Sequence, residues 1–429
     1  MNQIILPAIR LEGEIEVPGD KSITHRAFIL GSVCKGEVEI KNFSPAKDCL
    51  STLNCLRALG LKIETRNSEA LIQGEGLFGL NRPNEVLEAG NSGTTARLLC
   101  GLLAGQNFDS TITGDDSLKK RPMDRILQPL SLMGAKIHGR SQNRLLPVVI
   151  KGSSLRGIEY ELPVPSAQVK SALLLAGLLA EGTTRLRGAL NSRDHTERML
   201  QHLRAKFEAG PERLSLEGKR EFAGSKILVP GDFSSALFFS VAALLTSSSN
   251  LTIRNVGLNP TRTGAIAVLK RMQGEIVCTE EQLLNNEPSG TVITENSPLK
   301  STEILPEEIP GLIDEIPILA VAATQAEGVT LIRGAKELRV KESDRIRALA
   351  QELNKMGARV KELTDGLEIS GPTKLKGAAI NSGGDHRIAM ALAVAGLVAS
   401  GKTTIENSQW ADISFPNFFS ILEQVVIRG

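Results

Sequence analysis

The segment GDHRIAMALAVAGLVASGKTTIEN, residues 384–407, contains the pattern from which we predict the fold. It opens with polar residues, continues as an apolar run rich in Ala, turns at small residues and ends in a short β-branched strand. Self-similarity of this kind indicates a repeat architecture. The order occurs six times, with predicted strands at GEVEIKN (36–42), STITGD (110–115), GTTRLRG (182–188), SNLTIRN (249–255), GVTLIRG (328–334) and GKTTIEN (401–407).

Helix and strand alternate within each repeat, which predicts an α/β fold. Six repeats of roughly 65 to 80 residues, three in each half, are too long for the usual solenoid repeats. The first helix of each repeat is apolar on all sides, so we expect it inside its domain with the sheet outside. A second, more polar helix follows most of them, as in LRALGLKIE (56–64) and LNKMGARVK (353–361). A chain of 429 residues predicts two domains of about 200 residues each.

Composition excludes several classes of function. The net charge of +2 is too small for non-specific binding of nucleic acid, so an anionic partner is expected to be small. Five cysteines without CxxC pairs or zinc-ligand spacing predict reduced thiols and no metal site. The N-terminal residues do not form a signal peptide, and the longest apolar runs are too short to span a bilayer. We therefore expect a cytoplasmic protein without a membrane segment.

One motif is misleading. GLVASGKT, Gly396–Thr403, matches the GxxxxGK[ST] phosphate-binding pattern, which by itself would suggest an ATPase. A phosphate-binding loop follows a strand and precedes a helix, whereas here an apolar helix runs into Gly401 and a strand follows. The related GLLAEGTT (177–184) lacks the lysine at the same repeat position. We therefore predict a turn between a helix and a strand.

Polar residues at the start of three predicted helices are candidate ligands for an anion. GDKSITHR and LPVPSAQVKS present polar side chains where a helix offers unpaired amides and the positive end of its dipole. GNSGTTARL has small residues around a glycine, which permits close approach of a ligand. Solvated N-caps, a tight turn and a capping serine are the structural alternatives. The candidates here are Lys21, Ser22, Arg26, Gly93, Ser166 and Gln168.

Helix-opening segments in the second half of the chain add groups that can transfer protons. GLIDEIPILAVAA places two carboxylates before an apolar helix, where each is favoured by the helix N-terminus and could act as a base. RVKESDRI and GGDHRIAMAL cluster charges of both signs, for which a solvated charge run is the alternative interpretation. These segments contain Asp314, Glu315, Lys341, Glu342, Asp344, Arg345, Asp385, His386 and Arg387.

Cations occur at such segments in both halves of the chain. This distribution suits a cleft between two domains that holds a substrate with several anionic groups. The cations concerned are Lys21, Arg26, Arg121, Lys341, Arg345 and Arg387.

Seven segments together resemble the signature sequences of one enzyme family. PGDKSITHRA, GNSGTTARL, RPMDR, LPVPSAQVKSALLLAGL, LIDEIPILAVAA, RVKESDRI and GGDHRIAMALAVAGL appear in the order found in 5-enolpyruvylshikimate-3-phosphate synthase, 3-phosphoshikimate 1-carboxyvinyltransferase. They cover nearly the whole chain, and SAQVKS with GNSGTT is similar to the family's second sequence class.

The resemblance implies a specific fold. It is the two-domain, inside-out α/β barrel of enolpyruvyl transferases, built from six βαβαββ-like units. Residues 1–20 and 231–429 would form domain 1 and residues 21–230 domain 2. The repeated VPGD segments, 17–20 and 229–232, would be the hinge crossovers, with Phe233 where the first copy has Lys21.

The resemblance also implies a reaction without metal or cofactor. The enolpyruvyl group of phosphoenolpyruvate moves to the 5-hydroxyl of shikimate 3-phosphate, and phosphate is released as the domains close. By motif, shikimate 3-phosphate is held by Lys21, Ser22, Arg26, Ser166, Gln168, Asp314 and Lys341. Phosphoenolpyruvate is held by Lys21, Gly93, Arg121, Gln168, Arg345 and Arg387.

Two proton transfers are required by this reaction, and two carboxylates are assigned to them. Asp314 is the expected base for the attacking hydroxyl, and Glu342 the expected acid and base at the methylene carbon. Lys21 would stabilise the leaving phosphate and is a candidate proton donor.

The chain departs from the family near its C-terminus. WADISFPNFF has Asp412 and Ile413 where many members have a lysine, so that part of the phosphoenolpyruvate site is left unassigned. Gly93 predicts sensitivity to glyphosate, because a side chain there would crowd the inhibitor.

The sequence disfavours three alternatives. UDP-N-acetylglucosamine enolpyruvyl transferases have an asparagine after the first lysine and a cysteine before an Arg-Pro pair, whereas Ser22 follows Lys21 here and GDDSLKKRP lacks cysteine. RNA 3'-phosphate cyclases need a phosphate loop and a basic surface, and a non-catalytic scaffold would not need Asp314 and Glu342 beside cations. We expect a monomer that binds only these small-molecule substrates, with neither nucleic acid nor a membrane.

Overall fold

The computed structural model describes residues 1–429 and divides into two compact units. Unit 1 comprises Met1–Pro18, Gly231–Gln282 and Pro288–Gly429. Unit 2 comprises Gly19–Pro230 and Leu283–Glu287. Each unit has its own hydrophobic core, so each is described by itself.

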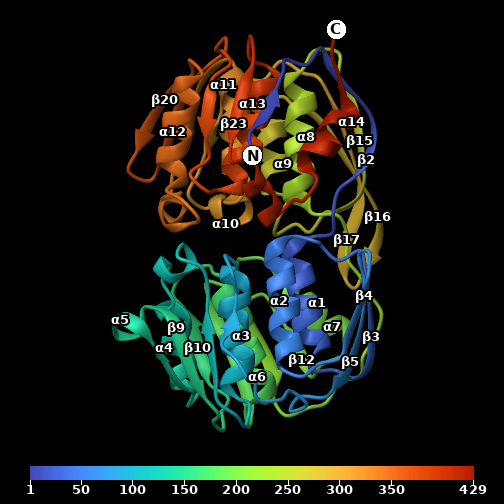
Figure 1. Ribbon diagram of the computed structural model, residues 1–429, viewed down its shortest axis with the longest axis vertical. Helices are drawn as coiled ribbons and strands as arrows, with labels where there is room; N and C mark the ends of the chain where they lie inside the picture. The colour runs from blue at the N-terminus through green and yellow to red at the C-terminus, as the bar shows by residue number, and fades with distance from the viewer. The chain divides into compact units, whose positions relative to one another are not determined.

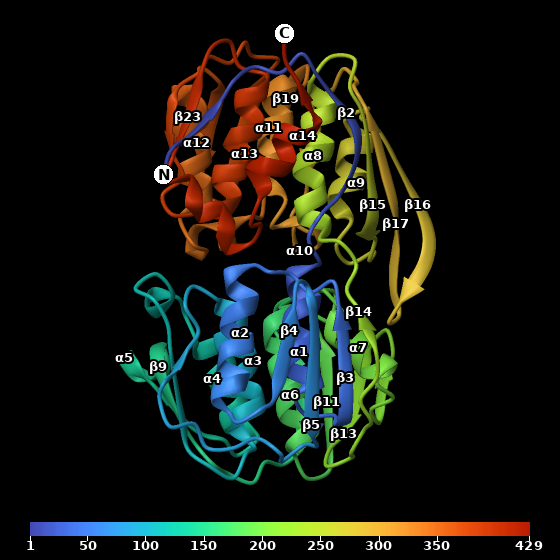
Figure 2. The ribbon, with the colours of Figure 1, turned by 45° about the vertical axis from the view of Figure 1, so that its right-hand side comes forward.

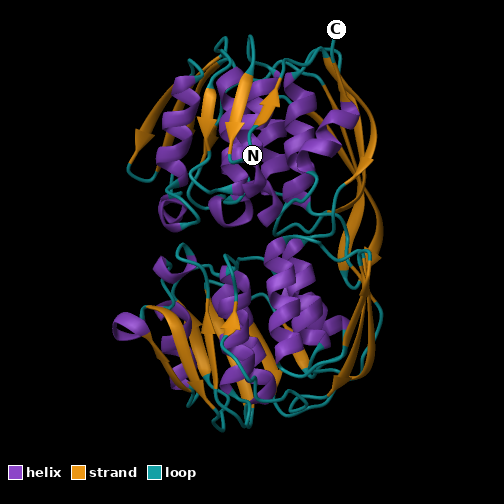
Figure 3. Cartoon of the chain, in the orientation of Figure 1, coloured by secondary structure: helices purple, strands orange, loops and turns teal.

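Three buried helices form the centre of each unit, as the apolar runs predict (Figures 1 and 3). In α8 every residue except Leu245 is buried, which explains why the run ALFFSVAALL has no polar face. In unit 1, α11 packs against both α8 and α13; in unit 2, α3 packs against α1 and α6. The central helices are α1 (Lys21–Gly31), α3 (Gly93–Ala104), α6 (Ala167–Leu179), α8 (Phe233–Leu245), α11 (Ile316–Gln325) and α13 (His386–Leu397).

The second helices of the repeats are buried on one side only, as their more polar sequences predict. In α12, for example, Ile346, Leu349 and Leu353 are buried at helical spacing while Arg347 is exposed. These helices are α2 (Lys47–Ala58), α4 (Asp124–Leu132), α7 (His195–His202), α9 (Gly264–Arg271) and α12 (Arg345–Lys355). The remaining helical segments are α5 (Arg140–Asn143), α10 (Ile309–Leu312), α14 (Phe418–Val425) and the 3₁₀ turns η1 (Leu118–Lys120), η2 (Lys336–Val340) and η3 (Ser408–Ile413).

Each of the six predicted strands is an inner strand of a different sheet, which confirms the repeat. A parallel neighbour flanks it on one side and an antiparallel strand on the other. The six strands are β3 (Lys35–Lys41), β7 (Ser110–Thr113), β11 (Thr183–Gly188), β15 (Asn250–Gly257), β19 (Gly328–Ile332) and β23 (Thr403–Glu406).

Unit 2 contains three four-stranded sheets, seen around its helices in Figure 2. Their orders are β14-β3-β5-β4, β6-β7-β9-β8 and β10-β11-β13-β12. The strands not yet given are β4 (Ile63–Arg66), β5 (Glu69–Glu75), β6 (Leu87–Glu88), β8 (Lys136–Gly139), β9 (Leu145–Lys151), β10 (Glu159–Leu162), β12 (Phe207–Ala209), β13 (Arg213–Glu217) and β14 (Ile227–Leu228).

Unit 1 contains sheets of five, four and three strands. Their orders are β16-β17-β15-β2-β24, β18-β19-β21-β20 and β1-β23-β22. The strands are β1 (Gln3–Ile5), β2 (Arg10–Glu16), β16 (Glu275–Leu284), β17 (Glu287–Glu295), β18 (Glu303–Ile304), β20 (Arg359–Leu363), β21 (Gly366–Gly371), β22 (Ala379–Asn381) and β24 (Val426–Ile427).

Two strands are exchanged between repeats at the VPGD segments. β2 precedes α1 in sequence but pairs with β15, whereas β14 precedes α8 but pairs with β3. The chain accordingly passes from unit 1 to unit 2 after Pro18 and returns after Pro230. In both turns the aspartate caps the next helix: Asp20 accepts from the amide of Ile23, and Asp232 from that of Ser235.

The structure departs from the predicted domain boundaries at residues 283–287. The prediction placed all of 231–429 in one domain, whereas these five residues lie in unit 2. They belong to unit 2 because their polar groups are bonded there. The Asn285 side chain accepts from the amide of Leu228, and Glu287 Oε1 lies 2.7 Å from Nδ1 of the buried His195.

The GLVASGKT segment has the predicted geometry of a turn rather than of a phosphate-binding loop. Helix α13 ends at Leu397 and β23 begins at Thr403, so no helix N-terminus follows Lys402. Gly401 has a φ of +84°, as has Gly182 at the same repeat position, which explains the glycine at both. In none of the helices are length and hydropathy sufficient to cross a membrane.

Candidate active site

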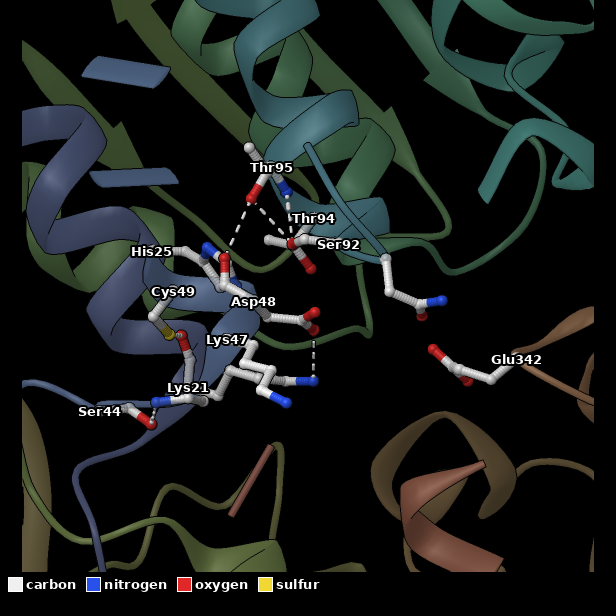
Figure 4. Close-up of polar contacts among 12 residues, drawn as sticks. Lys21, His25, Ser44, Lys47, Asp48, Cys49, Ser92, Thr94, Thr95 and Glu342 are labelled. Carbon is white, nitrogen blue, oxygen red and sulfur yellow. Dashed lines mark hydrogen bonds and ion pairs between the residues drawn. The ribbon is translucent and has the colours of Figure 1, made fainter. Parts of the chain in front are cut away.

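Lys21 is the first residue of α1 and forms an ion pair that the sequence did not predict. Its Nζ lies 3.0 Å from Oδ2 of Asp48, and the two side chains are only 16% and 10% exposed (Figure 4). Asp48 lies in the first turn of α2, where the helix dipole favours a carboxylate. Lys21 is therefore held in place by a neighbouring helix and is not a solvated surface charge.

Ser22 and Arg26 lie one turn apart on α1. Arg26 Nη1 donates to the Ser22 carbonyl at 2.8 Å, and its other nitrogens bond to α6 and α7. Burial lowers the pKa of Arg26 to about 10; nearby Glu197 and Asp20 oppose this shift and Arg193 adds to it. Because the guanidinium remains charged at neutral pH, it can still bind an anion.

Gly93 opens α3 in a crowded position. Ser92 caps the helix by accepting from the amide of Thr95 (Figure 4). A Cβ on Gly93 would lie 2.6 Å from Arg97 Nη1 and 3.7 Å from Arg121 Nη1. Glycine therefore allows the Arg97 guanidinium to approach the helix start closely, whereas Arg121 would be in ordinary contact with a Cβ.

Gln168 and Arg121 lie near Gly93. Gln168 Oε1 accepts from Arg97 Nη1 at 3.1 Å, and its Nε2 donates to Thr94 Oγ1 at 3.3 Å. Arg121 is buried and donates to the carbonyl and side-chain oxygens of Asn91 at 3.2 and 2.6 Å. Arg97 was missed, although its position four residues after Gly93 places it on the same helix face.

Ser166 has the structural role that was its alternative interpretation. Its side chain caps α6 by accepting from the amide of Val169, at a long 3.5 Å. The hydroxyl can still donate a hydrogen bond, so capping and ligand binding are compatible.

A chain of buried polar groups connects α1, α2 and α3 in unit 2. His25 Nδ1 lies 2.7 Å from Thr52 Oγ1, which lies 2.6 Å from Thr95 Oγ1. Thr95 Oγ1 in turn donates to Ser92 Oγ at 2.8 Å. This series of hydrogen bonds fixes the starts of the helices that carry Lys21 and Gly93.

His25 is expected to make unit 2 less stable in mild acid. Burial, followed by the charges of Lys21 and Arg26, holds the pKa of His25 well below its ordinary value. The unfolded chain therefore binds a proton first, and the free energy of unfolding falls as pH drops below about 6.5, by at most about 1.4 kcal/mol per pH unit. Urea unfolding at pH values between about 5 and 7 measures this slope.

The matched variants are His25→Gln, which should flatten the slope, and His138→Gln, at an exposed position, which should not. An unchanged slope in His25→Gln would show that other groups cause the loss of stability.

In unit 1, Asp314 lies among three arginines. Its Oδ1 is 3.4 Å from Arg345 Nη1, and its Oδ2 is 3.6 Å from Arg387 Nη2 and 4.0 Å from Arg262 Nη1. Arg387 Nη1 also donates to the Asp314 carbonyl at 3.2 Å. The predicted base is thus fixed by cations, two of which were predicted to bind phosphoenolpyruvate.

Arg345 joins the two predicted proton-transfer groups. It is 1% exposed, and its Nη2 donates to Glu342 Oε2 at 2.6 Å while its Nε donates to Asp385 Oδ2 at 2.7 Å. Burial alone would lower the pKa of Arg345, but the facing carboxylates Asp385, Glu342 and Asp314 raise it above its ordinary value. Lys341 is not part of this cluster: its Nζ lies 3.7 Å from Glu337.

Arg262 and Ser234 were missed by the sequence interpretation, and Glu315 was predicted only as a helix-start carboxylate. Glu315 is 1% exposed and accepts from the Ser234 hydroxyl, and its Oε1 is 3.5 Å from Arg262 Nη2. These residues come from three separate segments, so no local pattern marks them.

Asp412 and Ile413, at the departure from the family pattern, lie in η3. Ile413 is buried at 5% exposure, which fits an apolar residue at this position. The nearby Trp410 lies against Gly384: a Cβ placed on this glycine would be 3.8 Å from the indole ring.

Comparison with known proteins gives a consistent result over the whole chain. A family model described as EPSP synthase (3-phosphoshikimate 1-carboxyvinyltransferase) matches residues 6–422. The 3-phosphoshikimate 1-carboxyvinyltransferase of Desulforamulus reducens is 50% identical over 429 residues, 100% of both chains. That of Alkaliphilus metalliredigens is 52% identical over 419 residues, 97% of this chain and 98% of the relative.

Solved structures agree. An EPSP synthase from Acinetobacter baumannii superposes with a TM-score of 0.89 at 42% identity, covering 99% of this chain and 98% of that one. The enolpyruvyl transferase NikO from Streptomyces tendae has a TM-score of 0.80 at 20% identity, covering 98% and 96%, which shows a shared fold.

Proposed function

The chain belongs to the EPSP synthase family, and from this membership we propose how its residues carry out enolpyruvyl transfer. The reaction is that of 3-phosphoshikimate 1-carboxyvinyltransferase in the shikimate pathway. The observation that carries the assignment of residues is the Arg345 cluster, where one buried cation contacts both carboxylates proposed for proton transfer.

We propose that unit 2 supplies most of the substrate ligands. Its groups are charged or polar and are held by neighbouring helices, which lowers the entropy lost on binding. Those for shikimate 3-phosphate are Lys21, Ser22, Arg26, Ser166 and Gln168, joined by Asp314 and Lys341 of unit 1. Those for phosphoenolpyruvate are Lys21, Gly93, Arg121 and Gln168, joined by Arg345 and Arg387 of unit 1.

The proton transfers are assigned to the two carboxylates of the Arg345 cluster. Asp314 takes the proton of the 5-hydroxyl as its oxygen bonds to the central carbon of phosphoenolpyruvate, and Glu342 protonates the methylene carbon. In the second step the bond from the central carbon to the phosphate oxygen breaks, and Glu342 takes back a proton from the methyl group that was the methylene carbon. Lys21 stabilises the leaving phosphate and can protonate it.

A substrate-exchange assay tests this function. Phosphate release from phosphoenolpyruvate is measured with shikimate 3-phosphate and, separately, with UDP-N-acetylglucosamine. We expect release with the first acceptor alone. Release only with the second would assign the chain to the other branch of enolpyruvyl transfer, and release with neither would refute the function.

Gly93→Ala is expected to weaken inhibition by glyphosate. The new methyl group would displace Arg97 Nη1, the flexible end of a side chain, so the fold should persist. One methyl group in a tight site changes affinity by about 10- to 200-fold, so the inhibition constant should rise by this factor, with a smaller rise in the KM for phosphoenolpyruvate.

Gly311→Ala serves as the control, because its Cβ would meet nothing closer than 3.9 Å. Equal glyphosate inhibition of Gly93→Ala and the unmodified enzyme would remove Gly93 from the inhibitor site.

We further propose that units 1 and 2 are the two domains of the family, with hinges near 17–20 and 229–232. The monomer is the proposed active form, since each unit has a core of its own, and light scattering would detect a dimer. Five free cysteines, four of them buried, favour a reducing compartment such as the cytoplasm.

A further inference from the structure

The guanidinium of Arg26 has three of its five N–H donors bonded inside unit 2. Nε donates to Thr196 Oγ1 at 2.7 Å, Nη2 to Ser171 Oγ at 2.8 Å and Nη1 to the Ser22 carbonyl at 2.8 Å. Five donors less three leaves two, one on each Nη nitrogen. Such a pair can contact two oxygens of one carboxylate or phosphate group.

Ser171 and Thr196 form a closed triangle with Arg26. Their hydroxyl oxygens lie 2.6 Å apart, and their residues are 0% and 1% exposed. Each nitrogen of the guanidinium is anchored by a different atom, so the group can neither rotate about its axis nor tilt without breaking a bond. Arg26 itself is 4% exposed, so water offers little replacement.

The partners of Arg26 are neutral, in contrast to those of Arg345. Two hydroxyls and a carbonyl orient the guanidinium without cancelling its charge, whereas Arg345 faces carboxylates directly. An arginine oriented by neutral groups keeps its attraction for an incoming anion.

A buried ion pair holds the two helices that carry these hydroxyls. Lys170 and Glu197, adjacent in sequence to Ser171 and Thr196, have Nζ and Oε1 2.6 Å apart. Lys170 Nζ also donates to the carbonyls of Leu190 and Ser192 at 3.1 Å each, so it ties the α6–α7 connection as well. The positions of α1, α6 and α7 in unit 2 can be followed in Figure 2.

We propose that Ser171 and Thr196 are positioning residues, which fix the plane of Arg26 so that its two remaining donors face an anionic group of shikimate 3-phosphate. The inference rests on the proposed binding role of Arg26. It makes the hydroxyl pair a determinant of affinity for one substrate. Phosphoenolpyruvate, bound through other residues, is unaffected by it.

Steady-state kinetics of Thr196→Val and Ser171→Ala, with each substrate varied in turn, test the proposal. Each variant should raise the KM for shikimate 3-phosphate about tenfold, the effect of one hydrogen bond to a charged group. The KM for phosphoenolpyruvate and kcat should change less than about twofold, because Arg26 is proposed to bind shikimate 3-phosphate and to take no part in the proton transfers. Thr196→Ser, which keeps the hydroxyl, should restore the original KM.

The control is Thr184→Val. It removes a hydroxyl that is buried in the same unit and makes no hydrogen bond. It should leave both KM values unchanged. Thermal unfolding of every variant identifies any that does not fold; if Thr196→Val is unfolded, Ser171→Ala and Thr196→Ser decide the outcome. Equal changes in both KM values, or an unchanged KM for shikimate 3-phosphate in the folded variants, would overturn the proposal.

Arg26→Gln separates this inference from the function on which it rests. If Arg26→Gln raises the KM for shikimate 3-phosphate and the hydroxyl variants do not, only the positioning role is wrong. If Arg26→Gln also leaves that KM unchanged, the binding role of Arg26 is wrong and the inference falls with it.

Discussion

Glu342→Gln is expected to lower kcat by about 10²- to 10⁴-fold, the usual contribution of a positioned general acid or base. The amide keeps an oxygen that can accept from Arg345 Nη2, now 2.6 Å from the carboxylate, so the loop and the substrate sites should stay in place. What is lost is the proton transfer at the methylene carbon. The KM values should therefore change much less than kcat.

Deuterium incorporation distinguishes this role from a structural one. In deuterated water the unmodified enzyme should place deuterium at the methylene carbon, and Glu342→Gln should place it at least about 10²-fold more slowly at the same substrate concentration. Glu327→Gln, at an exposed position in unit 1, is the control and should retain both kcat and incorporation. Full incorporation by Glu342→Gln would assign the proton transfer to another group.

Asp314→Asn is expected to have an effect of similar size, about 10²- to 10⁴-fold on kcat, because it removes the proposed base for the 5-hydroxyl. It should also raise the KM for shikimate 3-phosphate, which Asp314 is proposed to bind. Loss of an anion 3.4–4.0 Å from three arginines should lower the free energy of unfolding by about 1–3 kcal/mol. Steady-state kinetics and urea unfolding measure the two effects.

Glu308→Gln provides the comparison for Asp314→Asn. It breaks another carboxylate–arginine pair of unit 1, in which Glu308 Oε1 lies 3.0 Å from Arg271 Nη1, without touching the proposed site. Stability should fall slightly and kcat should not change. If Asp314→Asn behaves in the same way, Asp314 is a structural residue and the base lies elsewhere.

The repeat and its secondary structure could be predicted from the sequence because their causes are local. An apolar run of helical length, a glycine that permits positive φ and a β-branched strand are read within one segment, as in residues 384–407. The same locality exposed the false phosphate-binding motif, since the order of helix, Gly401 and strand is a property of neighbouring residues.

The candidate site was predicted less completely, since motifs mark residues but not their partners. Arg345 with Asp314 and Glu342, and Gly93 with Gln168 through Arg97, came together in the structure. Asp48 beside Lys21 and Arg262 beside Glu315 lie outside the sequence motifs, because each is an ordinary charged residue in its own segment.

The sequence by itself determined the α/β repeat, the buried central helices and the family, since each depends on patterns within short segments. Only the tertiary structure decided which strands are exchanged, β2 to β15 and β14 to β3, and how Arg26 is oriented. The partners of Arg26 in α6 and α7 lie 145 and 170 residues away in sequence. Hydrogen bonds over such separations depend on where whole helices pack, and a hydroxyl in a helix sequence carries no sign of the group it will meet.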